Sequence, residues 1–263
     1  MLRNQTETLK VSTLVSIGAH PETGRARRSM TDARAVELAL NLKNTAVEVV
    51  HAGNPKNPAL DYYSGMGLST LKVLEQDEQQ DAITTLASYF RDNMPDIVLT
   101  GMRAELGESS GMLPFFLAYQ LQCPIVMGIA EILSVENGKA RVLQALPRGQ
   151  RRALSVSLPF VASVDLAAQE PRQSAYGRAR QCQVVRQTME EQSVDSEKMN
   201  WEESPAKAKA KRLKVVKAKS AADRFKAATA KSESSGGKVL QEQPIAEMAQ
   251  AVFDLLLEEG VVH

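Results

Sequence analysis

The chain has 263 residues, of which 43% are hydrophobic and 24% are charged, a balance that is ordinary for a soluble globular protein. This length allows one large domain, or one domain with an appendage, and a core that needs neither disulfides nor metals. The net charge of +1 gives the chain no overall attraction to nucleic acid or to an anionic membrane.

Short apolar runs, each followed closely by a glycine, indicate the first strands. They span residues 11–17 before Gly18, residues 46–51 before Gly53, and residues 96–100 before Gly101. Between them, apolar residues at helical spacing predict helices over residues 32–42 and 77–90. Strand, glycine turn and helix in alternation are typical of a parallel sheet with crossover helices.

These three glycines would meet at one edge of the sheet. Ligands of open parallel sheets bind beyond the carboxyl ends of the strands, so the turns at Gly18, Gly53 and Gly101 are expected to line a shared crevice. The alternative is that each glycine merely permits a tight turn. The sequence leaves both explanations open.

Antiparallel strands follow the parallel part. A third helix is expected over residues 111–121, a strand over residues 125–133, and a hairpin turn at Asn137-Gly138. Alternation in residues 154–158 and the apolar run 159–164 indicate further strands. The predicted fold class is α/β: a mostly parallel, Rossmann-like sheet with crossover helices, an added antiparallel hairpin and an extended C-terminal arm that ends in a helix; the family resemblance described below implies that this fold is of the adenine-nucleotide-binding kind.

The composition changes toward the C-terminus. Residues 190–203 hold six acidic residues against one lysine, and residues 205–231 hold ten basic residues against one aspartate. Such blocks are typical of extended or disordered chain. From Pro244 onward, apolar residues fall on one face of a helix. We therefore predict a nucleotide-binding-like domain over residues 1–185, a charged and partly disordered linker over 186–237, and an amphipathic helix within 238–263 that docks on a partner subunit.

Cysteine usage and hydropathy bear on location. The two cysteines, Cys123 and Cys182, are far apart, as expected of reduced thiols in a cytosolic protein. The N-terminus lacks the apolar region of a secretory signal, and no apolar run approaches the roughly 18 residues of a membrane span. We expect a soluble, cytoplasmic protein without membrane insertion.

Residues suited to catalysis are scarce. The chain has three histidines, His20, His51 and His263, and no nucleophile elbow, phosphate-loop lysine motif or dinucleotide fingerprint. His51 ends a predicted strand, where it is either a hydrogen-bonded structural histidine or a catalytic one. The pattern favours binding over catalysis, with no catalytic residue and no metal site.

The loop after the third predicted strand is the most informative one. It runs from Leu99 to Gly111 and leads into a predicted helix. Free amides at a helix start, together with Ser109, Ser110 and Gly111, would suit an anion such as phosphate. The alternative is that a serine only caps the helix.

Several motifs of the chain resemble those of electron-transfer flavoprotein β subunits. The stretch from Asp96 to Gly101 with Ala104, the strand from Pro159 to Leu166, and the run Gln169-Glu170-Pro171-Arg172 are similar to that family's motifs and are similarly spaced. Ser29-Met30, followed by an apolar helix, is similar to the start of the family's first helix. The resemblance extends over nearly the whole chain, and the Glu170-Pro171-Arg172 neighbourhood is its most specific part.

This resemblance implies a β subunit that pairs with a larger α subunit, which holds most of the FAD. Such a heterodimer accepts electrons from a flavin-dependent dehydrogenase and passes them to the respiratory chain, so the chain would be an electron carrier and not an enzyme. The β subunit also binds AMP. By position, the AMP pocket would comprise Ser16, Ser29, Asp32, Ala52, Thr100, Gly101, Ser109, Ser110 and Gly111.

A projecting loop of the family, which docks the dehydrogenase, corresponds to residues 173–180. Its single aromatic, Tyr176, has the composition of an interface anchor, and Arg178 and Arg180 could steer an acidic dehydrogenase surface. The alternative is that Tyr176 packs back onto its own domain.

Departures from the family pattern leave AMP binding open. Ser29-Met30-Thr31 replaces Asn-Pro-Phe, Met102-Arg103 replaces Lys-Gln, and residues 106–111 replace an acidic run. Two other functions are compatible with the sequence. One is a stand-alone adenine-nucleotide-binding module of the same fold. The other is nucleic-acid binding by the basic stretch 207–231, which is disfavoured because that stretch has a single aromatic.

Overall fold

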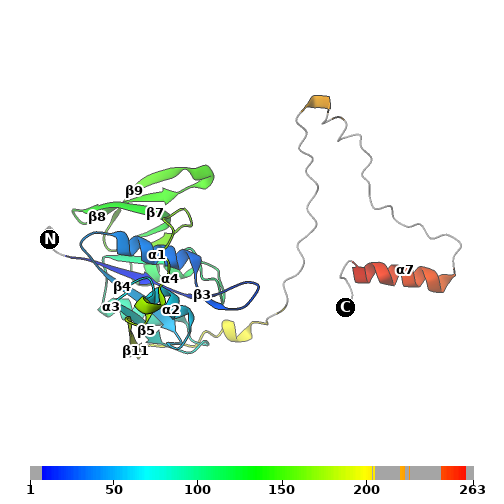
Figure 1. Cartoon of the computed structure of the whole chain (residues 1–263), viewed down its shortest axis with the longest axis horizontal. Coiled ribbons are helices and arrows are strands. Elements are labelled where there is room, and N and C mark those ends of the chain that lie inside the picture. Colours follow the sequence, from blue (N-terminus) through cyan, green and yellow to red (C-terminus); the bar gives the residue numbers. More distant parts are fainter. Residues whose placement is uncertain (1–7, 203, 205–219, 223–224, 226–243, 259–263) are drawn as a thin grey trace. The chain divides into compact units, whose positions relative to one another are not determined.

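The computed structural model describes residues 8–202, 204, 220–222, 225 and 244–258. The chain divides into a compact unit that ends at Glu202 and a second unit that begins at Glu203. The first unit contains the whole sheet, and the second contains the helix α7 (Ile245–Glu258) (Figure 1). The predicted division at residues 185 and 237 stays a prediction, and one strand, β11, runs across residue 185.

In the compact unit, strands and helices alternate along most of the chain. In chain order the elements are β1 (Leu9–Leu14), β2 (Ile17–Ala19), β3 (Ala26–Arg28), α1 (Met30–Asn41), β4 (Thr45–Gly53), α2 (Ala59–Ser64), β5 (Thr70–Glu75), α3 (Ala82–Asp92), β6 (Ile97–Gly101), α4 (Leu113–Gln120), β7 (Ile125–Glu136), β8 (Lys139–Ala145), β9 (Arg151–Ser157), β10 (Phe160–Val164), α5 (Tyr176–Ala179) and β11 (Gln183–Thr188).

One nine-stranded sheet organises the compact unit, in the order β11-β5-β4-β1-β6-β10-β7-β8-β9. Every pair from β11 to β7 is parallel, whereas β7–β8 and β8–β9 are antiparallel. The strands β2 and β3 form a separate antiparallel pair. The predicted α/β fold, with a mostly parallel sheet, crossover helices and an added hairpin, is therefore confirmed.

Helices cover both faces of the sheet (Figure 1). Because successive side chains of a strand point to opposite faces, Ile97 and Leu99 of β6 pack in the cluster that contains α1, and Val98 packs in the cluster that contains α3 and α4. A third cluster joins α1 and α2 to β4 and β5. Both β6 and β10 are buried throughout, as expected of parallel strands covered on two faces.

Local chemistry explains where elements begin and turn. The helix predicted from residue 77 begins at Ala82, because the Asp81 carboxylate caps it by accepting from the amides of Ile83 and Thr84 at 2.9 and 3.4 Å. The turn at Asn137-Gly138 joins β7 to β8 with φ of 51° and 72°. These left-handed values are those of the tight hairpin turn that an Asn-Gly pair favours.

Several described elements were not anticipated from the sequence: the β2–β3 pair, α2, β5, the single turn α5 and β11. The strand β11 is largely exposed and is the outermost strand of the sheet, beside β5. It therefore has no run of buried apolar residues from which a strand could be predicted. Among the described helices, none is both long and apolar enough to cross a membrane.

Candidate functional site

The carboxyl ends of β4, β1 and β6 lie next to one another at one edge of the sheet. The chain leaves β1 through α1 toward β4 and β5, then returns through α3 to β6 on the other side of β1. A sheet of this topology reverses direction at β1, where such folds place their ligands. Gly53 and Gly101 end the two flanking strands and Gly18 follows β1, so the structure gathers the three predicted glycines at this edge.

At Gly101 the need for glycine is one of space. A Cβ there would lie 2.0 Å from Asp32 Oδ1 and 2.4 Å from Thr31 Oγ1, both in the first turn of α1. Any side chain would push α1 away from the end of β6. The neighbouring Thr100 is buried, and its hydroxyl donates to the Gly101 carbonyl at 2.8 Å.

Asp32 is the buried centre of this edge, with 4% of its surface exposed. Its Oδ2 accepts hydrogen bonds from the Ser16 amide at 2.7 Å and the Ser16 hydroxyl at 2.5 Å. Burial raises the pKa of Asp32 to about 6, and the hydrogen bonds from Ser16 limit the rise. The Ser29 hydroxyl is buried beside them and has no hydrogen-bond partner among the described residues.

Tyr63 of α2 connects the segment after β1, at Ser16, to the start of α1, at Ser29. Its hydroxyl accepts from the Ser29 amide at 2.8 Å and donates to the Ser16 carbonyl at 2.8 Å. The side chain is fully buried, and burial raises its pKa well above the usual value, so the phenol stays protonated as this bond requires. Sequence reasoning missed Tyr63, because α2 has only six residues and no clear apolar period.

Glu105 fastens the loop after β6 to the start of α1. Its Oε2 accepts from Arg27 Nε and Nη2 at 3.1 and 2.9 Å, and its Oε1 accepts from the Met30 amide at 2.8 Å. The ion pair neutralises the charge of Glu105, and the amide bond satisfies a free donor at the N-terminus of α1. This contact was also missed, since residues 27 and 105 are far apart in sequence.

The expected anion loop begins its helix later than predicted, at Leu113. Ser109 and Gly111 adopt left-handed φ of 58° and 76°, and the Ser109 hydroxyl donates to the Ala104 carbonyl. The Ser110 hydroxyl accepts from the Met112 amide at 3.3 Å. Ser109 therefore closes its own loop, whereas Ser110 lies at the junction with α4.

Ala52 and His51 come from the end of β4. Ala52 packs against the cluster below α3 and α4. His51 is buried, and its Nδ1 lies 2.8 Å from the Val15 carbonyl, which can only accept, so Nδ1 carries the proton. Burial lowers the pKa of His51 and keeps it neutral, against the opposing effect of that hydrogen bond. This is the structural role that the sequence left open beside a catalytic one.

The three residues expected to meet a dehydrogenase lie together on the turn α5. Tyr176 is 77% exposed, so it does not pack back into the core. The Arg180 guanidinium lies 5.9 Å from the centre of the Tyr176 ring, and Arg178 approaches Gly67, in the turn between α2 and β5. One aromatic and two cations therefore share a small exposed surface.

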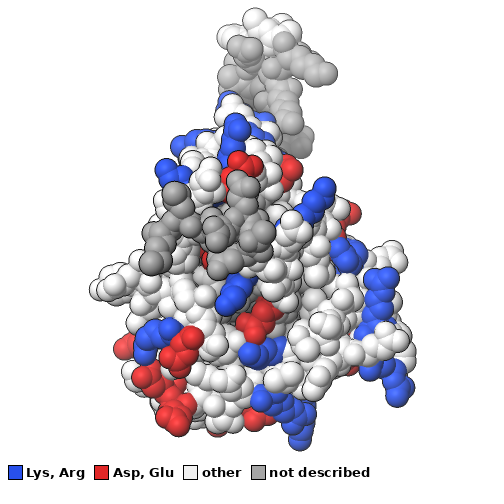
Figure 2. Space-filling model, turned by 90° about the vertical axis from the view of Figure 1, so that its left-hand side faces the viewer, with Lys and Arg blue, Asp and Glu red and all other residues white. Residues whose placement is uncertain are grey.

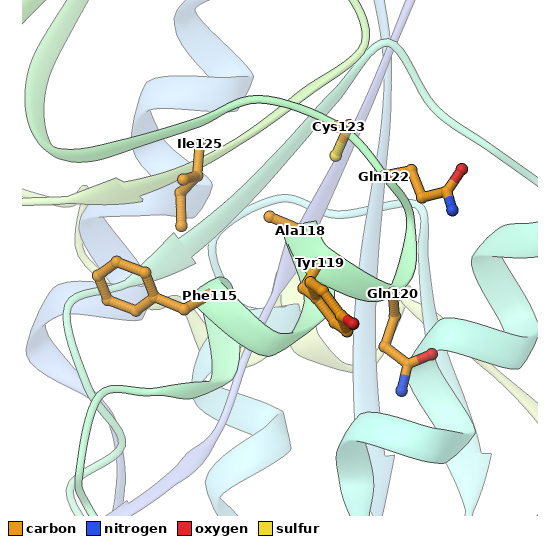
Figure 3. A pocket seen from close by; sticks show the side chains of 7 residues that line it. All are labelled: Phe115, Ala118, Tyr119, Gln120, Gln122, Cys123 and Ile125. Atoms are coloured by element: carbon orange, nitrogen blue, oxygen red, sulfur yellow. The ribbon is translucent and has the colours of Figure 1, made fainter.

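Other surface features offer less chemistry. An open hollow of about 580 Å³ lies beside α4, with Phe115, Tyr119 and Cys123 among its lining residues (Figure 3). Figure 2 shows a face on which basic and acidic side chains are interspersed among mostly uncharged residues. Within the described residues, no group of three or more His, Cys, Asp or Glu side chains is placed to hold a metal ion.

Comparisons with known proteins agree with this architecture. Residues 22–192 match the electron transfer flavoprotein domain family. The chain is also 48% identical over 261 residues to a protein of Chromohalobacter salexigens named electron transfer flavoprotein subunit beta, an alignment that covers 98% of this chain and 97% of that protein.

The structure is an α/β protein with a polar network at the carboxyl ends of its central parallel strands. The chain belongs to the electron transfer flavoprotein family, of which it is a β-type subunit. It is an electron carrier and not an enzyme.

Proposed function

We propose that the chain forms a heterodimer with an electron-transfer flavoprotein α subunit, which holds most of the FAD. The pair accepts electrons from a flavin-dependent dehydrogenase and passes them to the respiratory chain. The similarity to a named β subunit over almost the full length of both chains carries this proposal.

Co-expression with candidate α subunits tests the proposal. The expected product is a yellow heterodimer with a flavin spectrum, whereas the chain purified alone is poorly flavinated. A monomer that keeps stoichiometric FAD through gel filtration would overturn the assignment.

AMP is the nucleotide proposed for the crevice, with its phosphate at residues 109–111. Ser109 and Gly111, on both sides of Ser110, have left-handed φ, and left-handed residues within a turn are a feature of loops whose successive amides bind anions. Arg27 neutralises Glu105 at the same edge. Asp32 is directed to Ser16, so its charge is shared with internal donors and not left facing the nucleotide.

Substitution of Ser110 tests the phosphate position more sharply than substitution of Gly111. A Cβ at Gly111 would lie 2.8 Å from the Met102 carbonyl, so that change distorts the loop with or without a nucleotide. Ser110→Asp places a negative charge beside the phosphate, and Ser110→Asn is the matched neutral control. We expect AMP extracted from the heterodimer to be lost in Ser110→Asp and retained in Ser110→Asn. Equal recovery from both would place the phosphate elsewhere.

The helix α7 is proposed to dock on the α subunit. Five large apolar side chains of this helix are exposed: Ile245, Val252, Phe253, Leu255 and Leu257. An apolar surface of this kind is typical of an interaction site. Removing residues 244–263 should weaken the heterodimer, measured as the dissociation constant by analytical ultracentrifugation. An unchanged constant would separate α7 from the interface.

Tyr176 is proposed as the anchor for the dehydrogenase, with Arg178 and Arg180 steering the encounter. Its exposure on a polar turn supports this role, since tyrosine is enriched among the residues that dominate interface energies. Tyr176→Ala should raise the KM of a dehydrogenase for the heterodimer about tenfold and leave the flavin spectrum unchanged. Tyr176→Phe, which keeps the ring, should behave nearly as the wild type.

A further inference from the structure

The segment that carries Tyr176 is short and is held at both ends. It leaves the Glu170-Pro171-Arg172 turn and re-enters the sheet at β11, where the Gln183 amide donates to the Ser69 carbonyl at 2.9 Å. Between these points, residues 173–180 contain α5, a single helical turn. A four-residue helix has no stability of its own, so its shape must come from its contacts.

Arg172 provides the first contact. Its amide and Nε donate to Glu37 Oε2 at 3.0 and 2.7 Å, and its Nη2 donates to Glu37 Oε1 at 3.0 Å. The Glu37 side chain is 5% exposed. Burial by itself would raise the pKa of Glu37, but the bonds from Arg172 outweigh it and hold that pKa below its usual value. This paired fork fixes where the segment starts.

Gly65, at the end of α2, provides the second contact. Its carbonyl accepts from the Ala175 amide at 3.0 Å. A Cβ on Gly65 would lie 2.0 Å from Ser174 Oγ, 3.0 Å from the Ala175 amide nitrogen and 3.1 Å from the Ala175 carbonyl oxygen. The serine could rotate away, but the Ala175 backbone would have to shift by a few tenths of an ångström, which strains its hydrogen bond to the Gly65 carbonyl.

The backbone of Gly65 does not itself require glycine. Its φ of −66° and ψ of −10° are ordinary right-handed helical values, which alanine adopts at least as readily. The reason for glycine at this position is therefore the close approach of residues 174 and 175. This separates Gly65 from the glycines of the chain whose positive φ demands the residue.

We propose that Gly65 is a positioning residue for dehydrogenase docking. Because Gly65 has no side chain, residues 174 and 175 can pack directly against the end of α2, and this contact holds the Tyr176 turn in one pre-formed geometry. The inference rests on the proposed docking role of Tyr176 and adds a residue that does not itself touch the partner. Pre-formed contact surfaces bind more tightly because less ordering entropy is lost on association, so this contact contributes to affinity and not to electron transfer within the bound complex.

Gly65→Ala in the heterodimer tests this role. The electron donor is the flavin-dependent dehydrogenase, chosen from a panel, that reduces the wild-type heterodimer fastest. Two quantities are measured: hydrogen–deuterium exchange of residues 173–182, and the KM and kcat for the heterodimer as electron acceptor. We expect exchange at Ala175 to quicken about tenfold as the displaced segment opens locally. KM should rise about fivefold, with kcat and the flavin spectrum unchanged.

Two further variants make the result decisive. Asp61→Ala changes an exposed residue one turn earlier on α2 and should leave exchange and KM at wild-type values. Tyr176→Ala reports on the docking role itself. If Tyr176→Ala raises KM but Gly65→Ala changes neither exchange nor KM, the positioning role of Gly65 is refuted and the docking assignment stands. If Tyr176→Ala leaves KM unchanged, the docking assignment fails and the role of Gly65 fails with it.

Discussion

The helix α1 carries two buried carboxylates that experience opposite environments. Asp32 in its first turn and Glu37 further along are both 4% exposed. Neutral donors surround Asp32, and its pKa rises to about 6 because burial dominates. The Arg172 guanidinium donates to Glu37 and lowers the pKa of that carboxyl group, although burial by itself would raise it. Burial raises the pKa of both groups, and at Glu37 the hydrogen bonds and the charge of Arg172 outweigh it.

The two carboxylates also organise different parts of the protein. Asp32 holds Ser16 and the edge where a nucleotide is proposed, whereas Glu37 holds the turn that leads to Tyr176. Asp32 can take up a proton at mildly acidic pH. Glu37 must stay ionised to hold Arg172. Acid should therefore affect the two regions differently, and the following predictions test that contrast.

The largest effect is expected from the titration of Asp32. Because its folded pKa of about 6 exceeds its ordinary value of 3.8, the folded state binds the proton more tightly than the unfolded state. The contribution to stability is full below about pH 4 and is lost as the pH rises through 6. The gap between the two pKa values corresponds to about 3 kcal/mol. Urea unfolding from pH 4 to 7 should show this trend in the wild type but not in Asp32→Asn.

Removing the partner of Glu37 should cost about 2 kcal/mol of unfolding free energy. Arg172→Ala leaves a buried carboxylate without its cation, and the value is discounted because the Arg172 side chain is 36% exposed. Since the pKa of Glu37 is lowered from 4.5, the contribution of this pair is present above about pH 4.5 and is lost as the pH falls further. Urea unfolding at pH 7 and pH 3 checks this, and an equal deficit at both values would contradict it.

Tyr63→Phe should destabilise the crevice edge by about 1.5 kcal/mol. The change keeps the ring but removes the hydroxyl that joins the Ser29 amide to the Ser16 carbonyl, and so leaves two groups without that partner. Thermal unfolding of the purified chain measures the loss. If the melting temperature is unchanged, water or a neighbouring group replaces the hydroxyl.

The smallest effect is expected at an exposed ion pair. Arg91 Nη1 lies 2.9 Å from Glu191 Oε2, but both side chains are at least half exposed. Arg91→Ala should change the unfolding free energy by no more than about 0.5 kcal/mol. This variant is the control for Arg172→Ala, because it removes an arginine from an ion pair of similar length. A loss comparable to that of Arg172→Ala would mean that burial does not explain the contrast.

Much of the fold follows from local patterns. Runs of five to seven residues that are mostly apolar or β-branched mark β1, β4, β6 and β10, since strands covered on two faces are predominantly apolar. The Asn-Gly pair marks the β7–β8 turn because few other residues accept its left-handed angles. The placement of three glycines at the carboxyl ends of neighbouring strands then follows from the rules of parallel sheets.

The sites were only partly predictable. Ser16, Asp32 and Gly101 were named from the sequence as one group, and they do lie together. The residues that complete the edge, Tyr63 and Glu105, have no sequence signal, because a tyrosine in a short helix and a glutamate in a loop are common on any surface. Their roles arise from contacts across 34 and 75 residues of chain.

The sequence by itself determined the alternation of strands and helices, the hairpin, and which strand ends share an edge. These follow from backbone sterics and apolar periodicity, which act over a few residues. Tertiary structure alone decided that β11 pairs with β5 as the outermost strand and that the pKa of Asp32 rises while that of Glu37 falls. It also decided that Gly65 lies against the Tyr176 turn. Each of these depends on which distant group packs against the residue, so its charge, its solvent and the space for its side chain are set only when the chain has folded.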